Sequence, residues 1–132
     1  MRGKALHNYM ASEIKAACDQ LSVRSELEYA IRFDDVKVYF DIALWVKESF
    51  LVCEVETTLR NVIHNVQKAY AFEAELWIVV PTRKLRRQVA NKLRRVELKP
   101  AGQEINLLLL NQFKQALMNK LSLSITANRV AG

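Results

Sequence analysis

The sequence predicts an α/β (α+β) domain in which a mixed sheet lies between layers of helices. The spacing of apolar residues changes between the helical and the strand period along the chain, in the order α-β-β-β-α-β-α-β-α. Short polar connections join the first three strands, which favours an antiparallel meander. The chain has 132 residues, of which 51% are hydrophobic, with only 3 Gly and 2 Pro. This length supplies one core but not two, so we expect residues 1–132 to form a single domain.

The first half of the chain predicts one helix followed by three strands. Apolar residues recur at steps of three and four from Leu6 to Leu21, which predicts a helix over residues 4–21. The period then changes to two, and the three consecutive strands that this predicts cover residues 25–33, 36–46 and 50–57.

The second half predicts alternating helices and strands. We expect Thr58 to cap a helix whose apolar stripe runs from Leu59 to Tyr70. The remaining predicted elements are a buried strand at 76–80, a basic helix capped by Thr82, a strand at 105–110 and a helix at 111–121.

Composition argues against a membrane protein and against a disulfide or zinc scaffold. The longest apolar runs, such as Leu76 to Val80, are far shorter than the roughly 20 residues that span a bilayer. No apolar segment of the kind found in signal peptides follows Met1, and Cys18 and Cys53 lack metal-ligand spacing. We therefore expect a soluble intracellular, cytoplasmic protein without a membrane partner. Because no Gly-rich phosphate loop is present, we expect no small-molecule organic cofactor.

The net charge of +6 is concentrated in one segment. Residues 83–99 hold eight Lys and Arg residues against Glu97 alone, so the segment carries +7 and the rest of the chain −1. Such a patch predicts a polyanionic partner, with nucleic acid first, although a solvated helix face is the alternative. The residues expected to contact nucleic acid are Arg83, Lys84, Arg86, Arg87, Arg94 and Arg95.

Three carboxylates occur where strands should be apolar. Glu54 and Glu56 share one face of the third predicted strand, and Asp41 interrupts the apolar second strand. Antiparallel pairing could bring Asp41 beside Glu54, and converging carboxylates are costly unless a cation joins them. Oxygen ligands suit Mg²⁺ or Mn²⁺. The alternative is that these residues lie on the solvated face of an edge strand or at an irregular strand position.

Glu13 occupies an unexpected position in the first helix. Helical geometry puts it between Tyr9 and Met10, in the middle of the apolar arc. Either its carboxylate reaches solvent from the edge of the sheet, or it points into a polar site inside the fold.

These residues resemble the PD-(D/E)xK nuclease superfamily, and the small archaeal Holliday junction resolvases within it. The matching segments are Phe40 to Leu44, with Asp41, and Val52 to Thr57, with Glu54. Over residues 5–81 the order of elements is also similar to the restriction-endonuclease-like α-β-β-β-α-β core, here extended by a C-terminal α-β-α.

The resemblance implies a metal-dependent DNA endonuclease that hydrolyses phosphodiester bonds, with branched or junction DNA as a candidate substrate. It implies that Asp41, Glu54 and the carbonyl of Val55 hold Mg²⁺ or Mn²⁺, and that Glu13 supports the metal or its water. Since cutting a duplex or junction needs two sites, we expect a symmetric homodimer formed through the C-terminal strand and helix, where Leu117 and Leu121 continue an apolar face.

The sequence departs from the family pattern at Glu56, where the superfamily carries a lysine. A carboxylate there could act as a base or bind a second metal. The missing polar group could instead come from the next helix, where the predicted stripe favours Gln67 and turns Lys68 away. The departure also supports an alternative function, a catalytically inactive nucleic-acid-binding module within a larger complex.

Overall fold

The computed structural model describes residues 3–95 and 104–131. The order of helices and strands is the predicted one, with a short 3₁₀ turn, η1, added before the last helix. The elements are α1 (Gly3–Gln20), β1 (Arg24–Phe33), β2 (Val36–Val46), β3 (Ser49–Val55), α2 (Val62–Ala71), β4 (Glu75–Val80), α3 (Arg83–Arg95), β5 (Ile105–Leu109), η1 (Leu110–Gln112) and α4 (Phe113–Ala131).

The five strands of the described segments form one mixed sheet in the order β1-β2-β3-β4-β5. The first three strands form the predicted antiparallel meander, in which Ile42 pairs with Cys53. β3, β4 and β5 run parallel to one another, since Val55 pairs with Val79 and Val80 pairs with Leu109. The carboxyl ends of β3, β4 and β5 therefore lie at one edge of the sheet.

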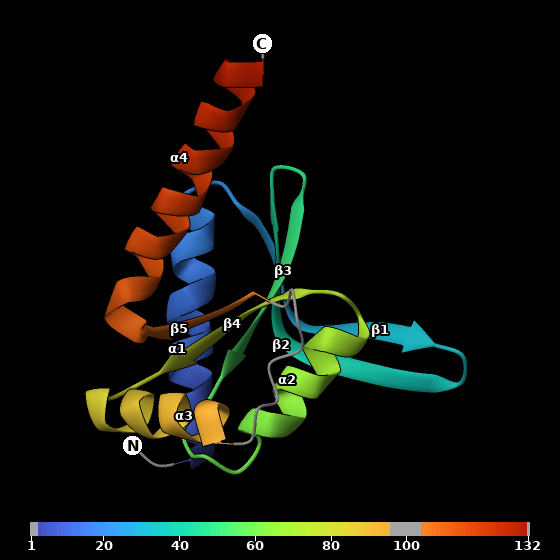
Figure 1. The fold of residues 1–132 in the computed structure, drawn as a ribbon, viewed down its shortest axis with the longest axis vertical. Helices are drawn as coiled ribbons and strands as arrows, with labels where there is room; N and C mark the ends of the chain where they lie inside the picture. The colour runs from blue at the N-terminus through green and yellow to red at the C-terminus, as the bar shows by residue number, and fades with distance from the viewer. Residues whose placement is uncertain (1–2, 96–103, 132) are drawn as a thin grey trace.

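Helices cover both faces of the sheet, which makes the molecule three-layered (Figure 1). Met10 of α1 and Phe113 of α4 belong to the hydrophobic core on one face. Val66 of α2 and Val89 of α3 belong to a second core on the other face. Because each helix buries only one apolar stripe, its polar residues remain available at the surface.

Two predicted helix caps have different outcomes. The cap of α3 is confirmed, because the Leu85 amide donates a hydrogen bond of 3.1 Å to Thr82 Oγ1. The cap of α2 is wrong: the helix begins at Val62 after Asn61, and Thr58 Oγ1 instead accepts a 3.3 Å bond from the Arg60 amide. Residues 58–61 thus form a turn, and the helix starts one turn later than predicted.

The apolar face expected to form a dimer interface lies largely inside the fold. Leu117 is fully buried in the core that α4 shares with α1, and the half-buried Leu121 packs against the same core. α4 continues to Ala131, well beyond the predicted end, and its C-terminal half extends past the sheet (Figure 1). The expectation that Leu117 is exposed for a second subunit is therefore wrong.

β1 and β2 are each longer than β3. The hairpin that they form therefore projects from the side of the sheet (Figure 1). Its alternation of faces is interrupted at Asp41, because Phe40 and Ile42 belong to opposite cores although they are two residues apart. Glu28 lies in β1 between the partners of those two residues and has a φ of 49°. A left-handed backbone is uncommon for a residue other than glycine, so both strands are irregular beside Asp41.

The described helices and the two cysteines bear on two expectations drawn from composition. None of the described helices has the length and hydrophobicity needed to cross a membrane. Cys18 and Cys53 are free thiols within the core, as expected for small apolar residues.

Candidate functional site

A polar pocket of about 350 Å³ lies at the carboxyl end of β3, between β2 and α2. Its walls bring together charged or titratable side chains from α1, both strands and α2. They are His7, Asp41, Glu54, Glu56, His64 and Lys68.

The predicted meeting of Asp41 and Glu54 occurs in this pocket. The pairing of Ile42 with Cys53 puts the preceding Asp41 across from Glu54. The Val55 amide donates a 2.8 Å hydrogen bond to Asp41 Oδ2, which fixes the carboxylate at the end of β3. The same oxygen lies 3.1 Å from His7 Nε2. Asp41 keeps 24% of its side chain exposed, whereas Glu54 is buried, so one carboxylate is open to the pocket and the other lies beneath it.

Lys68 of α2 brings a lysine side chain into the pocket. The sequence had predicted that this side chain points away from the buried face of the helix. Its Nζ lies 2.9 Å from Glu54 Oε1 and donates a 2.6 Å hydrogen bond to the carbonyl oxygen of Tyr39. The ammonium also lies 4.9 Å from the centre of the Phe40 ring. Lys68 thus links α2 to the irregular part of β2 and to the buried carboxylate of β3.

The prediction that Gln67 faces the candidate site is also wrong. The buried residues of α2 are Val62, Asn65, Val66 and Ala69. This stripe is rotated by roughly 70° about the helix axis from the predicted one, because Tyr70 is exposed whereas Asn65 and Ala69 are buried. The rotation turns Lys68 toward the sheet and leaves Gln67 exposed, lining a neighbouring groove instead of the pocket.

Glu56 is buried just beyond the end of β3. Its amide donates a 3.0 Å hydrogen bond to the Val79 carbonyl oxygen, which extends the pairing with β4. Its Oε1 accepts a short hydrogen bond from Asn65 Nδ2. The carboxylate therefore ties β3 to α2 at the position where the superfamily pattern has lysine.

Burial raises the pKa values of both glutamates of the pocket. The pKa of Glu54 rises to about 9, mainly because burial disfavours its charge and also because Asp41 is close, while Lys68 opposes the rise. Burial raises the pKa of Glu56 to about 7, against the hydrogen bond from Asn65. Each charged glutamate is therefore incompletely compensated, and carboxylates of this kind are candidates for cation binding or proton transfer.

The donors of the pocket are compatible with a hard divalent cation. No group of three or more His, Cys, Asp or Glu side chains within residues 3–95 and 104–131 has the arrangement of a metal site. The pocket nevertheless offers the carboxylates of Asp41 and Glu54 and the backbone carbonyl of Val55. This set is sufficient for Mg²⁺, which commonly binds one or two protein carboxylates and keeps several waters. Glu54 Oε1 is buried without a hydrogen bond of good geometry, so its lone pairs are incompletely satisfied.

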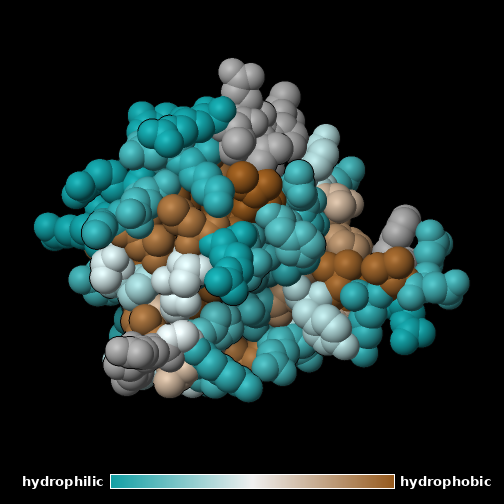
Figure 2. Space-filling model, turned by 90° about the horizontal axis from the view of Figure 1, so that it is seen from below, coloured by the Kyte–Doolittle hydropathy of each residue, from teal (hydrophilic) through white to brown (hydrophobic). Residues whose placement is uncertain are grey.

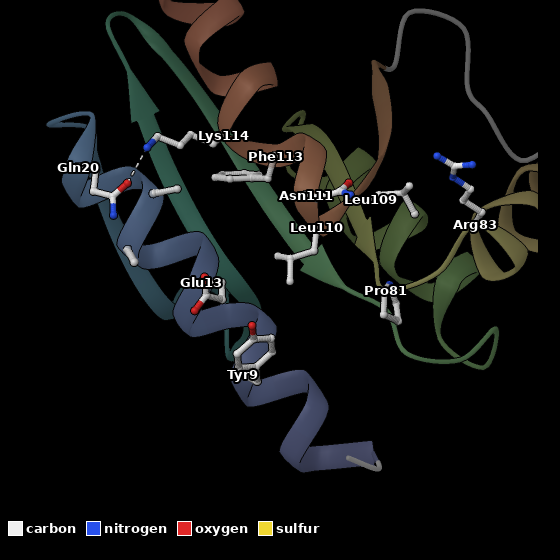
Figure 3. Close-up of a pocket in the computed structure, with 12 residues that line it drawn as sticks. Tyr9, Glu13, Gln20, Pro81, Arg83, Leu109, Leu110, Asn111, Phe113 and Lys114 are labelled. Carbon is white, nitrogen blue, oxygen red and sulfur yellow. Dashed lines mark hydrogen bonds between the residues drawn. The ribbon is translucent and has the colours of Figure 1, made fainter.

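Glu13 does not lie in this pocket, which corrects its predicted role. The buried stripe of α1 is formed by Met10, Ile14, Ala17 and Cys18, and Glu13 lies roughly 80° from its centre around the helix. Glu13 is exposed and faces a separate cavity of about 610 Å³ between α1 and the start of α4 (Figure 3). His7, near the beginning of α1, is the residue that the helix contributes to the pocket.

The basic residues of α3 lie where the sequence predicted them, on the side away from the core. Five are exposed to solvent, and their hydrophilic surface is visible at the upper left of Figure 2. They are Arg83, Lys84, Arg87, Arg94 and Arg95. Arg86 is half-buried and donates a 2.9 Å hydrogen bond to Gln112 Oε1. Lys92, also half-buried, bonds to the Leu59 carbonyl oxygen at 3.0 Å.

Among the polar residues of the pocket that sequence reasoning missed are His7, His64, Asn65 and Lys68. For the last two, the usable signal was their spacing of three residues, which puts them on one side of a helix. The two histidines carry no comparable signal.

No protein-family model and no curated protein matches this chain.

Proposed function

We propose that the protein is a metal-dependent DNA endonuclease that hydrolyses phosphodiester bonds in the pocket at the end of β3. The observation that carries this proposal is the buried, incompletely compensated Glu54 beside Asp41, with Lys68 2.9 Å from its Oε1. Carboxylates and an ammonium group in a small polar pocket are the groups that phosphodiester hydrolysis requires.

Asp41, Glu54 and the carbonyl of Val55 would hold Mg²⁺ or Mn²⁺. The bound ion would polarise the phosphate and lower the pKa of a water molecule. Asp41 is oriented for this role by the Val55 amide, and its exposed part faces the pocket. The favourable interaction with a cation would compensate the desolvation of Glu54, which Lys68 alone leaves partly uncompensated.

Lys68 and Glu56 have separate roles in this proposal. The Lys68 ammonium is held between Glu54 and the Tyr39 carbonyl, where it can orient a phosphate oxygen or the attacking water. Glu56 binds Asn65 through Oε1, which leaves Oε2 to accept a proton from that water. Its pKa of about 7 suits a general base at neutral pH.

We also propose that the chain is a divergent PD-(D/E)xK nuclease with a restriction-endonuclease-like core. The order of elements and the opposed Asp41 and Glu54 support this assignment. Lys68, from the following helix, would replace the lysine that the motif carries where this chain has Glu56. The exposed cations of α3 support DNA as the substrate, and a homodimer would supply the second active site for a duplex or junction.

The second candidate is a catalytically inactive nucleic-acid-binding module within a larger complex. The observation that favours it is that the polar groups already have protein partners: Lys68 contacts Glu54, His7 contacts Asp41 and Asn65 contacts Glu56. In that case the same contacts would serve only to hold β2, β3 and α2 together.

Cleavage of labelled DNA distinguishes the two functions. Linear duplex, single-stranded, flapped and four-way-junction DNA are incubated with Mg²⁺, Mn²⁺ or chelator, using wild type, Asp41→Ala and Glu54→Ala. We expect metal-dependent cutting that both substitutions abolish in variants shown to be folded by circular dichroism. Binding without cutting in either metal would instead support the inactive module.

A further inference from the structure

A cavity of about 610 Å³ lies at the carboxyl ends of β4 and β5, with α1 along one side (Figure 3). Pro81, which follows β4, and Leu109, the last residue of β5, both line it. None of the described residues that line this cavity belongs to the pocket that holds Asp41 and Glu54. A ligand of the cavity would therefore be bound apart from the proposed active site.

The cavity lies where the connections of the sheet change sides. β4 and β5 are neighbouring parallel strands, and Val80 pairs with Leu109 at their ends. The chain leaves β4 toward α3, whose Val89 packs on one face of the sheet, and leaves β5 toward α4, whose Phe113 packs on the other. Because the two connections go to opposite faces, they leave a crevice between the strand ends, and α/β proteins commonly bind ligands in such a crevice. The topology therefore places this cavity at a usual position for a binding site.

The size and the apolar lining of the cavity suit a small organic ligand. Pockets for such ligands have volumes of roughly 300 to 1,000 Å³. Phe113 and Leu109 are buried beneath the cavity, and Leu110 is half-buried beside them. On the α1 side, Tyr9 is 46% exposed, and its ring forms part of the wall (Figure 3). A ligand with an aromatic ring could pack against Tyr9 and cover this apolar surface.

Side chains of opposite charge line opposite sides of the cavity. Arg83 extends from the start of α3, whereas Glu13 lies on α1 (Figure 3). In the described parts of the chain, neither Arg83 nor Glu13 forms an ion pair. The Lys114 ammonium donates a 2.8 Å hydrogen bond to Gln20 Oε1, which is a neutral partner. Two cations without a carboxylate partner and one carboxylate therefore favour an anionic ligand that also carries a hydrogen-bond donor.

We propose that this cavity binds a nucleoside monophosphate. The planar guanidinium of Arg83 suits two phosphate oxygens, and the Asn111 side chain on the same side of the cavity can donate a further hydrogen bond. Glu13 can accept hydrogen bonds from the sugar hydroxyls, and the base can stack on Tyr9. The proposal goes beyond the nuclease function and does not depend on it.

Titration of the ¹⁵N-labelled protein with AMP, followed by amide chemical shifts, both locates the site and gives its affinity. We expect the shifts to concentrate in residues 109–114 and Arg83→Ala to weaken AMP binding at least roughly tenfold. Arg32→Ala is the matched control, because Arg32 is an exposed arginine outside the cavity. Ala16→Phe should also abolish binding, since it adds a ring to the wall at an exposed helix position without removing a charge. Ala5→Phe, at an exposed position of the same helix outside the cavity, should not.

Partial ligands and a DNA strand complete the test. Adenosine and inorganic phosphate should each bind at least roughly tenfold more weakly than AMP, because each makes only part of the contacts. Phosphate that binds as tightly as AMP, or AMP affinity unchanged in both Arg83→Ala and Ala16→Phe, would overturn the proposal. A single-stranded oligodeoxythymidylate that displaces AMP would identify the ligand as a nucleotide of a DNA strand, whereas simultaneous binding would identify a free nucleotide. Both of these results support the site and differ only in the source of its ligand.

Discussion

Replacing Glu54 by Gln should stabilise the metal-free protein at neutral pH, although Lys68 Nζ lies 2.9 Å from the Glu54 side chain. The folded-state pKa of Glu54 is about 9, against 4.5 as its ordinary value. A group with a raised folded pKa lowers stability progressively as pH rises above the unfolded value. At pH 7 the difference of 2.5 pH units corresponds to about 3 kcal/mol, at about 1.4 kcal/mol per unit.

This value already includes the attraction of Lys68, which opposes the rise in the pKa of Glu54. At pH 7 the folded wild type carries the protonated carboxyl, which Gln resembles in shape and charge, and Lys68 keeps its hydrogen bond to the Tyr39 carbonyl. The stabilisation by Glu54→Gln is therefore about 3 kcal/mol at pH 7. It should increase at pH 8 and disappear near pH 4, where the carboxyl is protonated in both the folded and the unfolded chain.

Urea unfolding of wild type and Glu54→Gln at pH 4, 7 and 8 in EDTA measures this difference. Glu75→Gln is the matched control, because Glu75 pairs with Lys120 at 2.8 Å outside the pocket. Although burial acts to raise the pKa of Glu75, hydrogen bonds from Lys120 and Trp77 lower it. Glu75→Gln should therefore destabilise the protein at pH 7, with the loss shrinking as pH falls. An equal destabilisation by Glu54→Gln at all three pH values would show that the pKa of Glu54 is not raised in the folded protein.

Three further substitutions test other parts of the account. Leu117→Ala should lower the free energy of unfolding in urea by about 2 to 5 kcal/mol, since Leu117 packs inside one chain. The mass measured by light scattering should not change, and an altered mass at unchanged stability would contradict this. Asn65→Ala should lower stability by about 1 to 3 kcal/mol at pH 8, because the Glu56 carboxylate loses its buried donor, and by less at pH 5. Arg87→Glu should weaken DNA binding and flatten its salt dependence by about one phosphate contact, as measured by anisotropy; an unchanged slope would exclude α3 from the interface.

The sequence predicted the layers of the fold because hydrophobic periodicity is a local signal. β2 has its predicted bounds, and Thr82 caps α3 as expected, since both features depend on neighbouring residues. α2 was misplaced because Thr58 has the chemistry of a cap and yet lies in a turn. The predicted stripe was also rotated, because it included the exposed Tyr70 and omitted the buried Asn65 and Ala69, and this exchanged the positions of Gln67 and Lys68.

The candidate site was predicted only where strand pairing determines it. Asp41 and Glu54 come together because antiparallel neighbours of known register share a face. The proximity of His7 to Asp41 depends on how α1 packs across the sheet, which local periodicity does not specify. Glu13 was placed in the middle of the apolar arc of its helix because Tyr9 was counted in that arc, although Tyr9 is exposed.

The most direct test of the central claim is single-turnover cleavage of branched DNA with Mn²⁺ by Lys68→Met and by Lys120→Met. Both substitutions remove a lysine that forms an ion pair with a glutamate, but only Lys68 lies in the proposed active site. We expect Lys120→Met to cut at the wild-type rate and Lys68→Met, shown to be folded, to lose cleavage. Wild-type cleavage by Lys68→Met, or no cleavage by the wild type itself, would contradict the central claim.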